Sequence, residues 1–170
     1  MDTFLTIVSR REVREYDGRP LPDDVVRRIL EAGRVSGSSQ NRQQWRFVVV
    51  ESADVRARLA ETVYVPANIR GAALVVAIAT YGRGPTSFDA GRVAQNMMLA
   101  AWSEGVGSTP NGMPDRAASA AVLGLEEGEE PAIILSFGYP ARPRHPERRA
   151  PEEWIQRANR KPFDEVVTRI

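Results

Sequence analysis

Cysteine is absent from this sequence of 170 residues, which excludes disulfide bonds, thiolate metal ligands and cysteine nucleophiles. Histidine occurs once, as His145, so a zinc site built from several histidines is excluded as well. His145 lies among proline and arginine residues at 142–146, a composition typical of an exposed loop, and we do not expect it to act as a catalytic base. Lysine also occurs once, as Lys161, so arginine carries nearly all the positive charge. Arginine suits phosphate binding, but compositional bias explains its excess more simply.

An excess of one charge is also missing, because the formal net charge is +1. Such a balance provides no general field for binding nucleic acid or an anionic membrane. The longest strongly apolar stretch, residues 72–80, is too short to span a bilayer, and the first residues lack the basic and apolar segments of a signal peptide. We therefore expect a cytoplasmic protein that binds neither nucleic acid nor membrane.

The composition is ordinary for a folded protein, with 42% hydrophobic and 26% charged residues. The length suits one domain better than two, and the sequence shows neither an internal repeat nor a domain linker. We therefore expect a single domain over residues 1–170.

Apolar patterns predict helices that alternate loosely with strands. β-Branched and aromatic runs predict strands at 45–50, 73–79 and 132–138 and a short strand at 107–111. The second of these runs is apolar throughout, which predicts burial on both faces. Helical spacing and start signals predict helices at 3–10, 22–33, 53–63, 88–104 and 114–123, whereas 162–167 fits either a helical turn or a strand. These elements predict an α+β or α/β fold in which several helices surround a mostly antiparallel sheet.

The predicted helix at 88–104 is the longest, and it contains many apolar and small residues. Two explanations fit this composition equally well. The helix either packs at a subunit interface or lies within the core of its own chain.

Several enzyme signatures are missing, including the Gly-x-Gly-x-x-Gly fingerprint, the phosphate-binding P-loop and the Gly-x-Ser-x-Gly nucleophile turn. Two segments nevertheless stand out. Residues 10–14 carry three arginines within five positions, which could clamp a phosphate, although such a cluster is more often a solvated surface. Residues 38–50 place small polar side chains before Trp45 and a strand, a combination that suits a planar heterocycle but also fits an ordinary polar loop.

Together these segments resemble the FMN-dependent nitroreductase family. The shared features are the basic opening at 10–14, the Ser-x-x-Asn-x-Gln segment before Trp45, the apolar strand at 72–76, and the Asp-x-Gly-x-x-x-Gln-Asn helix that begins at Asp89. The glycine-rich turn at 105–108, the strand from 131 to Pro140 and the Arg-Lys-Pro-Phe-Asp-Glu-Val-Val segment at 160–167 follow in the same order. The resemblance therefore covers almost the whole chain.

This resemblance implies a nitroreductase-like α+β fold, an intertwined homodimer, and two FMN sites at the dimer interface. It also implies a ping-pong oxidoreductase that passes electrons from NADH or NADPH to a nitroaromatic, a quinone or a similar electron-poor acceptor. The flavin would perform the redox step, so no catalytic side chain and no metal ligand is assigned.

Site residues follow from the matching positions. The resemblance implies phosphate and ribityl binding by Arg10, Arg11, Arg14 and Arg160, and ring binding by Ser38, Ser39, Asn41, Gln43 and Asn68. It further implies that a backbone N–H of the turn near Pro110 and Gly112 faces the reactive nitrogen of the flavin.

The chain differs from the family pattern in and around the expected pocket. Glu12 replaces a serine, Gly37 and Gln44 replace prolines, and Arg42 and Arg46 add charge. These departures motivate an alternative, a flavin- or deazaflavin-binding protein without nicotinamide turnover that serves in storage or sequestration. A third hypothesis, nucleic-acid binding through the arginine-rich segments, is weakened by the net charge of +1.

Overall fold

The computed structural model describes residues 2–170 and confirms the predicted α+β fold. Its strands are β1 (Trp45–Val49), β2 (Leu74–Tyr81), β3 (Gly107–Asn111) and β4 (Glu129–Gly138). Its α-helices are α1 (Thr3–Ser9), α2 (Asp23–Arg34), α3 (Ala53–Ala60), α4 (Pro66–Arg70), α5 (Thr86–Ser103), α6 (Arg116–Leu123), α7 (Pro151–Arg157) and α8 (Phe163–Val166). Two short 3-10 helices, η1 (Ser39–Asn41) and η2 (Pro146–Arg148), complete the elements.

Most predicted boundaries lie within a few residues of the observed ones. The clearest extension is β4, which begins at Glu129 because Glu129 and Glu130 already pair with Tyr81 and Thr80 of β2. The tail that fitted a turn or a strand is helical, as α8. The short helix α4 was not predicted, since its five residues are too few to show a helical period.

The chain divides into two compact units. The larger unit, Arg11–Pro143, contains the sheet and α2 to α6. The smaller unit combines the N-terminal residues through Arg10 with Arg144–Ile170, and within it α1 packs against α7 and η2. No helix among residues 2–170 has the length and apolar character needed to cross a membrane.

All three strand pairings in the sheet are antiparallel, in the order β1-β2-β4-β3. β2 lies in the interior of the sheet, and the residues from Leu74 to Ala79 are all buried. This confirms that its unbroken apolar run reflects burial on both faces. A register shift between Ile78 and Ala79 falls near the end of β2 that leads to α5.

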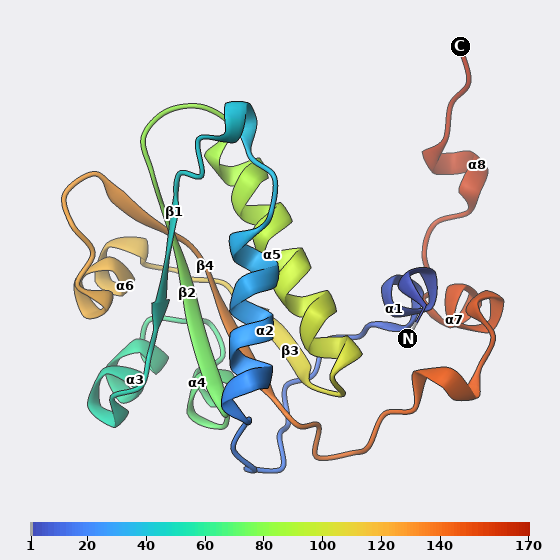
Figure 1. Ribbon diagram of the computed structural model, residues 1–170, viewed down its shortest axis with the longest axis horizontal. Coiled ribbons are helices and arrows are strands. Elements are labelled where there is room, and N and C mark those ends of the chain that lie inside the picture. The colour runs from blue at the N-terminus through green and yellow to red at the C-terminus, as the bar shows by residue number, and fades with distance from the viewer. Residues whose placement is uncertain (1) are drawn as a thin grey trace. The chain divides into compact units, whose positions relative to one another are not determined.

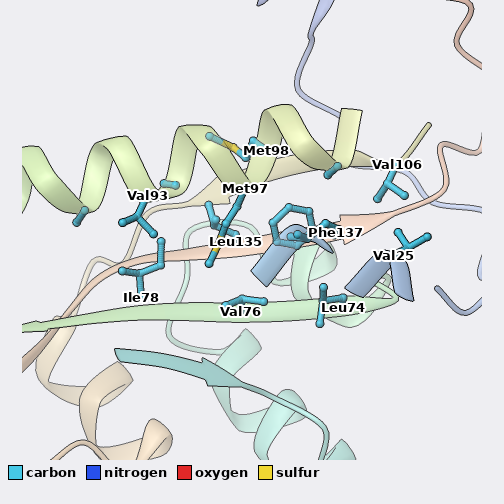
Figure 2. Close-up of a cluster of buried hydrophobic side chains, with 14 residues drawn as sticks. Val25, Leu74, Val76, Ile78, Val93, Met97, Met98, Val106, Leu135 and Phe137 are labelled. Carbon is cyan, nitrogen blue, oxygen red and sulfur yellow. The ribbon is translucent and has the colours of Figure 1, made fainter. Parts of the chain in front are cut away.

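Helices α2 and α5 lie side by side across one face of the sheet (Figure 1). Their buried side chains join those of β2 and β4 in one apolar cluster that includes Val25, Met97 and Phe137 (Figure 2). The two helices approach closely at Gly33, where a Cβ atom would lie 2.2 Å from Cε of Met97. Because Gly33 is near the end of α2, this contact fixes where the following polar loop begins.

Helices α3, α4 and α6 cover the opposite face of the sheet (Figure 1). A second apolar cluster there includes Leu59, Ile69 and Ile134. Two of these helices begin at side-chain caps, since Ser52 accepts from the N–H of Val55 and Asp115 accepts from the N–H of Ala118. The sheet therefore separates two sets of helices, and each set carries a different part of the candidate site.

Candidate functional site

The polar loop between α2 and β1 has an unusual backbone. Gln40, Asn41 and Gln43 have φ angles of 52°, 54° and 52°. This left-handed region costs a residue with a side chain about 1–2 kcal/mol, and asparagine tolerates it better than glutamine. Three such residues within four positions persist only where surrounding contacts hold them, and strain of this kind concentrates at binding sites.

Hydrogen bonds hold this loop in place. The backbone N–H of Gln43 donates to Oγ of Ser38 at 2.9 Å, and the N–H of Asn41 donates to the carbonyl oxygen of Ser38 at 3.0 Å. The backbone N–H of Ser39 donates to Oδ2 of Asp89, near the start of α5, at 3.0 Å. The loop is thereby anchored both to itself and to a helix of the core.

Asp89 is only 7% exposed, and it also lies beside a cation. Nη1 of Arg92, one turn further along α5, is 3.8 Å from Oδ1 of Asp89. The same guanidinium occupies the space beside Gly37, where a Cβ atom would lie 2.3 Å from Nη2 of Arg92. Gly37, which replaces a proline of the family pattern, therefore leaves room for Arg92. The charge of Arg92 lies beside the Asp89 carboxylate that anchors the loop.

The loop leaves several polar groups without partners among residues 2–170. Asn41 uses its side-chain oxygen to accept from Nε2 of Gln43 at 3.2 Å, but its own amide nitrogen makes no hydrogen bond there. The hydroxyl of Ser39 and the side-chain oxygen of Gln43 are likewise unpaired within that range. Three of the predicted ring-binding residues thus offer a donor, an acceptor and a hydroxyl for an external molecule.

A glycine-rich turn between β2 and α5 packs against the same loop. Nη1 of Arg42 donates to the carbonyl oxygen of Arg83 at 3.3 Å, and Nη2 donates to Oε1 of Gln40 at 2.7 Å. Gly82 lies so close to Gln44 that a Cβ atom would be 1.9 Å from its Nε2. Gln44, which replaces the family's second proline, therefore packs beneath this turn.

Arg46 is engaged away from the loop. It forms a two-pronged ion pair with Glu129 at the start of β4, in which Nε donates to Oε1 at 2.8 Å and Nη2 donates to Oε2. This hydrogen bonding, together with the backbone N–H of Glu126, lowers the pKa of Glu129 from 4.5 to about 2. The charge that Arg46 adds beside the pocket is thus already neutralised.

A second group of predicted residues lies where α4 meets β3. Asn68 is 4% exposed, and its Nδ2 donates to Oδ1 of Asn111 at 3.0 Å. Nδ2 of Asn111 in turn donates to Oγ of Ser136 at 2.8 Å and to the carbonyl oxygen of Ile134 at 3.2 Å. The structure therefore places Asn68 in a buried amide network, and its role toward a flavin stays a prediction.

The predicted turn at Pro110 and Gly112 lies at the end of β3. Both residues are exposed, and the carbonyl oxygen of Gly112 accepts from the backbone N–H of Tyr64 at 3.1 Å. Because Tyr64 lies just before α4, this bond and the Asn68–Asn111 pair join the two segments that contain Asn68 and the predicted turn.

The basic opening is shared between the two units. Arg11 and Arg14 belong to the larger unit, where the backbone N–H of Val13 between them donates to the carbonyl oxygen of Ser108 on β3 at 3.0 Å. Arg10 and Arg160 belong to the smaller unit. Arg14 and Arg160 are exposed, and Nη1 of Arg160 donates to the carbonyl oxygen of Ala158 at 3.1 Å. The segment with Arg11 and Arg14 thus runs beside β3, which ends at Asn111 within the predicted turn.

Sequence reasoning missed two residues that organise these groups. Asp89 was part of the family motif but not a predicted site residue, because an acidic residue in the first turn of a helix needs no further explanation. Asn111 lay in the predicted flavin-facing turn, but nothing in the sequence indicated its pairing with Asn68. Both contacts join residues more than forty positions apart, so no local spacing could have revealed them.

Comparisons with known proteins agree with this architecture, an antiparallel sheet with helices on both faces. The sequence profile of the Nitroreductase family matches residues 7–86 and 67–139. A NADH dehydrogenase of Thermus thermophilus is 24% identical over 194 aligned positions, which cover 91% of this chain and 95% of that protein.

Solved structures extend the likeness to the fold. A nitroreductase family protein of Clostridium difficile superposes with a TM-score of 0.84 at 23% identity and covers 99% of this chain and 98% of its own. The NADPH:FMN oxidoreductase of Vibrio harveyi, solved with NAD+, gives a TM-score of 0.77 at 25% identity over 83% of this chain and 70% of its own. This chain belongs to the nitroreductase family.

Proposed function

We propose that this protein is an FMN-dependent oxidoreductase that passes electrons from NADH or NADPH to an electron-poor acceptor such as a nitroaromatic or a quinone. The observation that carries the proposal is the strained loop at 38–43, which is held by Ser38 and Asp89 and directs unpaired polar groups outward. A family relative, the Vibrio harveyi enzyme, is named an NADPH:FMN oxidoreductase. We further propose that residues 1–170 act as one nitroreductase-like domain.

The residues present fit FMN chemically. A flavin ring presents alternating donors and acceptors, and the loop offers the amide nitrogen of Asn41, the side-chain oxygen of Gln43 and the hydroxyl of Ser39. A phosphate calls for arginine, and Arg14 is exposed beside the segment that pairs with β3. Arg11, in the same unit as Arg14, adds a further cation on the proposed phosphate side, and the family resemblance also assigns Arg10 and Arg160 to phosphate binding.

Each group of residues has a distinct task in this proposal. FMN, when bound, supplies the two-electron chemistry by which a nicotinamide is oxidised and an acceptor is reduced in turn, in a ping-pong sequence. The loop at 38–43 would bind and orient the ring, and a backbone N–H of the turn near Pro110 and Gly112 would donate to its reactive edge without a titratable side chain. The arginines hold the phosphate.

The two ring-binding groups lie on opposite faces of the sheet. Ser39 is tied to α5 on one face, whereas Asn68 lies on α4 on the other. We propose that the complete site takes its loop from one copy and its Asn68 and Gly112 from another, which makes the protein a homodimer with two equivalent sites. The exposed side of α5, where Phe88 is 68% exposed beside Gly91, is available for such a contact.

The first experiment is the visible absorption spectrum of the purified protein before and after incubation with FMN and desalting. We expect a retained flavin band that bleaches on addition of NADH or NADPH and recovers with an added quinone. Steady-state rates at several acceptor concentrations should give parallel reciprocal plots, as a ping-pong sequence requires. A flavin band that neither nicotinamide bleaches would support the storage or sequestration alternative instead, and absence of any flavin binding would contradict both.

The deazaflavin variant of that alternative is less favoured by the geometry. It needs the added arginines to grip a longer anionic tail, but Arg46 is already neutralised by Glu129. Of the two arginines that the chain adds beside the pocket, only Arg42 remains without a carboxylate partner among residues 2–170.

A further inference from the structure

Arg42 is held in position entirely by neutral groups. Its guanidinium donates to Oε1 of Gln40 at 2.7 Å and to the carbonyl oxygen of Arg83 at 3.3 Å. Arg42 is exposed, and no carboxylate within residues 2–170 forms an ion pair with it. A guanidinium that is held in one orientation and has no counter-charge can bind an anion from solution.

Arg83 adds a second cation next to the first. It lies at an exposed turn between Gly82 and Gly84, whose φ angles are 78° and 121°. Those angles suit glycine, and the missing side chains let the turn approach closely, since a Cβ atom on Gly84 would lie 3.1 Å from Nη1 of Arg42. Arg83 has no ion-pair partner in the described part of the chain either.

Two acidic residues near this turn are already engaged. Asp89 accepts from the backbone of Ser39 and lies beside Arg92, and Glu129 is paired with Arg46. Neither of these two carboxylates forms an ion pair with Arg42 or Arg83. The start of α5 at Thr86, directly after the turn, adds the favourable end of a helix dipole.

We propose that Arg42 and Arg83 bind a phosphate of the nicotinamide dinucleotide that reduces the protein. This inference rests on the proposed function, because Arg42 lies within the loop assigned to the flavin ring. Both arginines are exposed and adjoin the loop at 38–43, so the phosphates of a nicotinamide stacked on a ring bound there would come within their reach. The phosphate is either the 2′-phosphate, which only NADPH carries, or the pyrophosphate, which both dinucleotides carry.

Binding without turnover tests the site directly. Adenosine 2′,5′-bisphosphate and adenosine 5′-diphosphate, titrated into FMN-loaded protein by calorimetry, represent the two phosphates. We expect Arg83→Gln to weaken one of these probes roughly five- to tenfold, as the loss of a charge-assisted hydrogen bond at an exposed site would do. Arg27→Gln, which removes an exposed arginine on α2 that forms no ion pair among residues 2–170, is the matched control and should change neither.

Steady-state kinetics then separates the two sources. If the 2′-phosphate is bound, Arg83→Gln and Arg42→Gln raise the KM for NADPH and leave that for NADH unchanged. If the pyrophosphate is bound, both KM values rise together. Arg42→Lys, which keeps the charge but loses the two-pronged donor, should fall between the wild type and Arg42→Gln. FMN affinity is measured in each variant, and Arg83→Gln, which lies outside the loop at 38–43, should leave it unchanged.

Unchanged affinity for both probes in Arg83→Gln and Arg42→Gln would overturn the proposal. Failure of the proposed function looks different. In that case the protein would show no nicotinamide oxidation, but the probe titrations would still report whether the two arginines bind phosphate. A loss of probe binding that also occurs in Arg27→Gln would likewise overturn the site, because it would reflect net charge alone.

Discussion

The backbone N–H of Ser39 donates to Oδ2 of Asp89 at 3.0 Å, across fifty positions of the sequence. This bond ties the strained loop to α5, so the loop's shape depends on a carboxylate outside it. Asp89→Ala should destabilise the protein by about 1–3 kcal/mol, since it leaves a half-buried N–H unpaired and Arg92 without its neighbour. Urea unfolding measures this change.

The control for that variant is Asp54→Ala. Asp54 also lies in the first turn of a helix and also pairs with an arginine, Arg58, at 3.1 Å, but the pair is exposed. Its loss should cost about 0.5 kcal/mol or less. Equal losses for Asp54→Ala and Asp89→Ala would show that the bond to Ser39 contributes nothing.

Gly37 and Arg92 should depend on each other. A methyl group at position 37 would lie 2.3 Å from Nη2 of Arg92, so Gly37→Ala forces the guanidinium away from Asp89. We expect a loss of about 1 kcal/mol in the wild type and almost none in an Arg92→Ala background, where the space is open. A double-mutant cycle by chemical denaturation gives the coupling. Additive effects would mean that the cost of Gly37→Ala does not come from Arg92.

The ion pair between Arg46 and Glu129 predicts a defined pH dependence. Because the pKa of Glu129 is lowered from 4.5 to about 2, this group stabilises the folded protein fully above pH 4.5, and the contribution is lost as the pH falls toward 2. Arg46→Gln should therefore be less stable than the wild type at pH 6, and the difference should narrow as the pH falls through that range. Thermal unfolding at a series of pH values measures it, and a constant difference would contradict the assigned cause.

The amide pair of Asn68 and Asn111 should be costly to break. Asn111→Ala leaves the buried Nδ2 of Asn68 and the hydroxyl of Ser136 without their partner, with an expected loss of about 2–3 kcal/mol. The double variant with Asn68→Ala should lose less than the sum of the two single changes. Gln95→Ala, an exposed amide on α5, serves as the control for urea unfolding and should be nearly neutral.

Sequence patterns were sufficient to predict the architecture because buried positions recur along the sequence at the period of a helix or a strand. The apolar run of β2 and the periodic residues of α2 and α5 appear where they were predicted. The composition of α5 left its environment open between a core and an interface. The structure shows a wide buried stripe from Ala90 to Trp102, which confirms packing in the chain's own core, and an exposed Phe88, so the subunit interface stays a prediction.

The candidate site was predictable only in part. The loop at 38–43 could be identified from its polar composition and its resemblance to a family motif, but not its three left-handed residues, since glutamine rarely adopts that region. The pairing of Arg46 with Glu129 reaches across β2 and depends on strand order, which no local spacing encodes. The effect of Gly37 was visible only once Arg92 was seen beside it.

The placement of Ser39 and Asn68 on opposite faces of the sheet has a genetic consequence. Suppose that each site draws on two copies of the chain. A dimer whose two copies both carry a defective loop, or both carry a defective amide network, then has two damaged sites. A mixed dimer of the two defective chains collects both defects in one site and leaves the other intact. Two inactive alleles expressed together would then complement each other, whereas a site built within one chain would never recover.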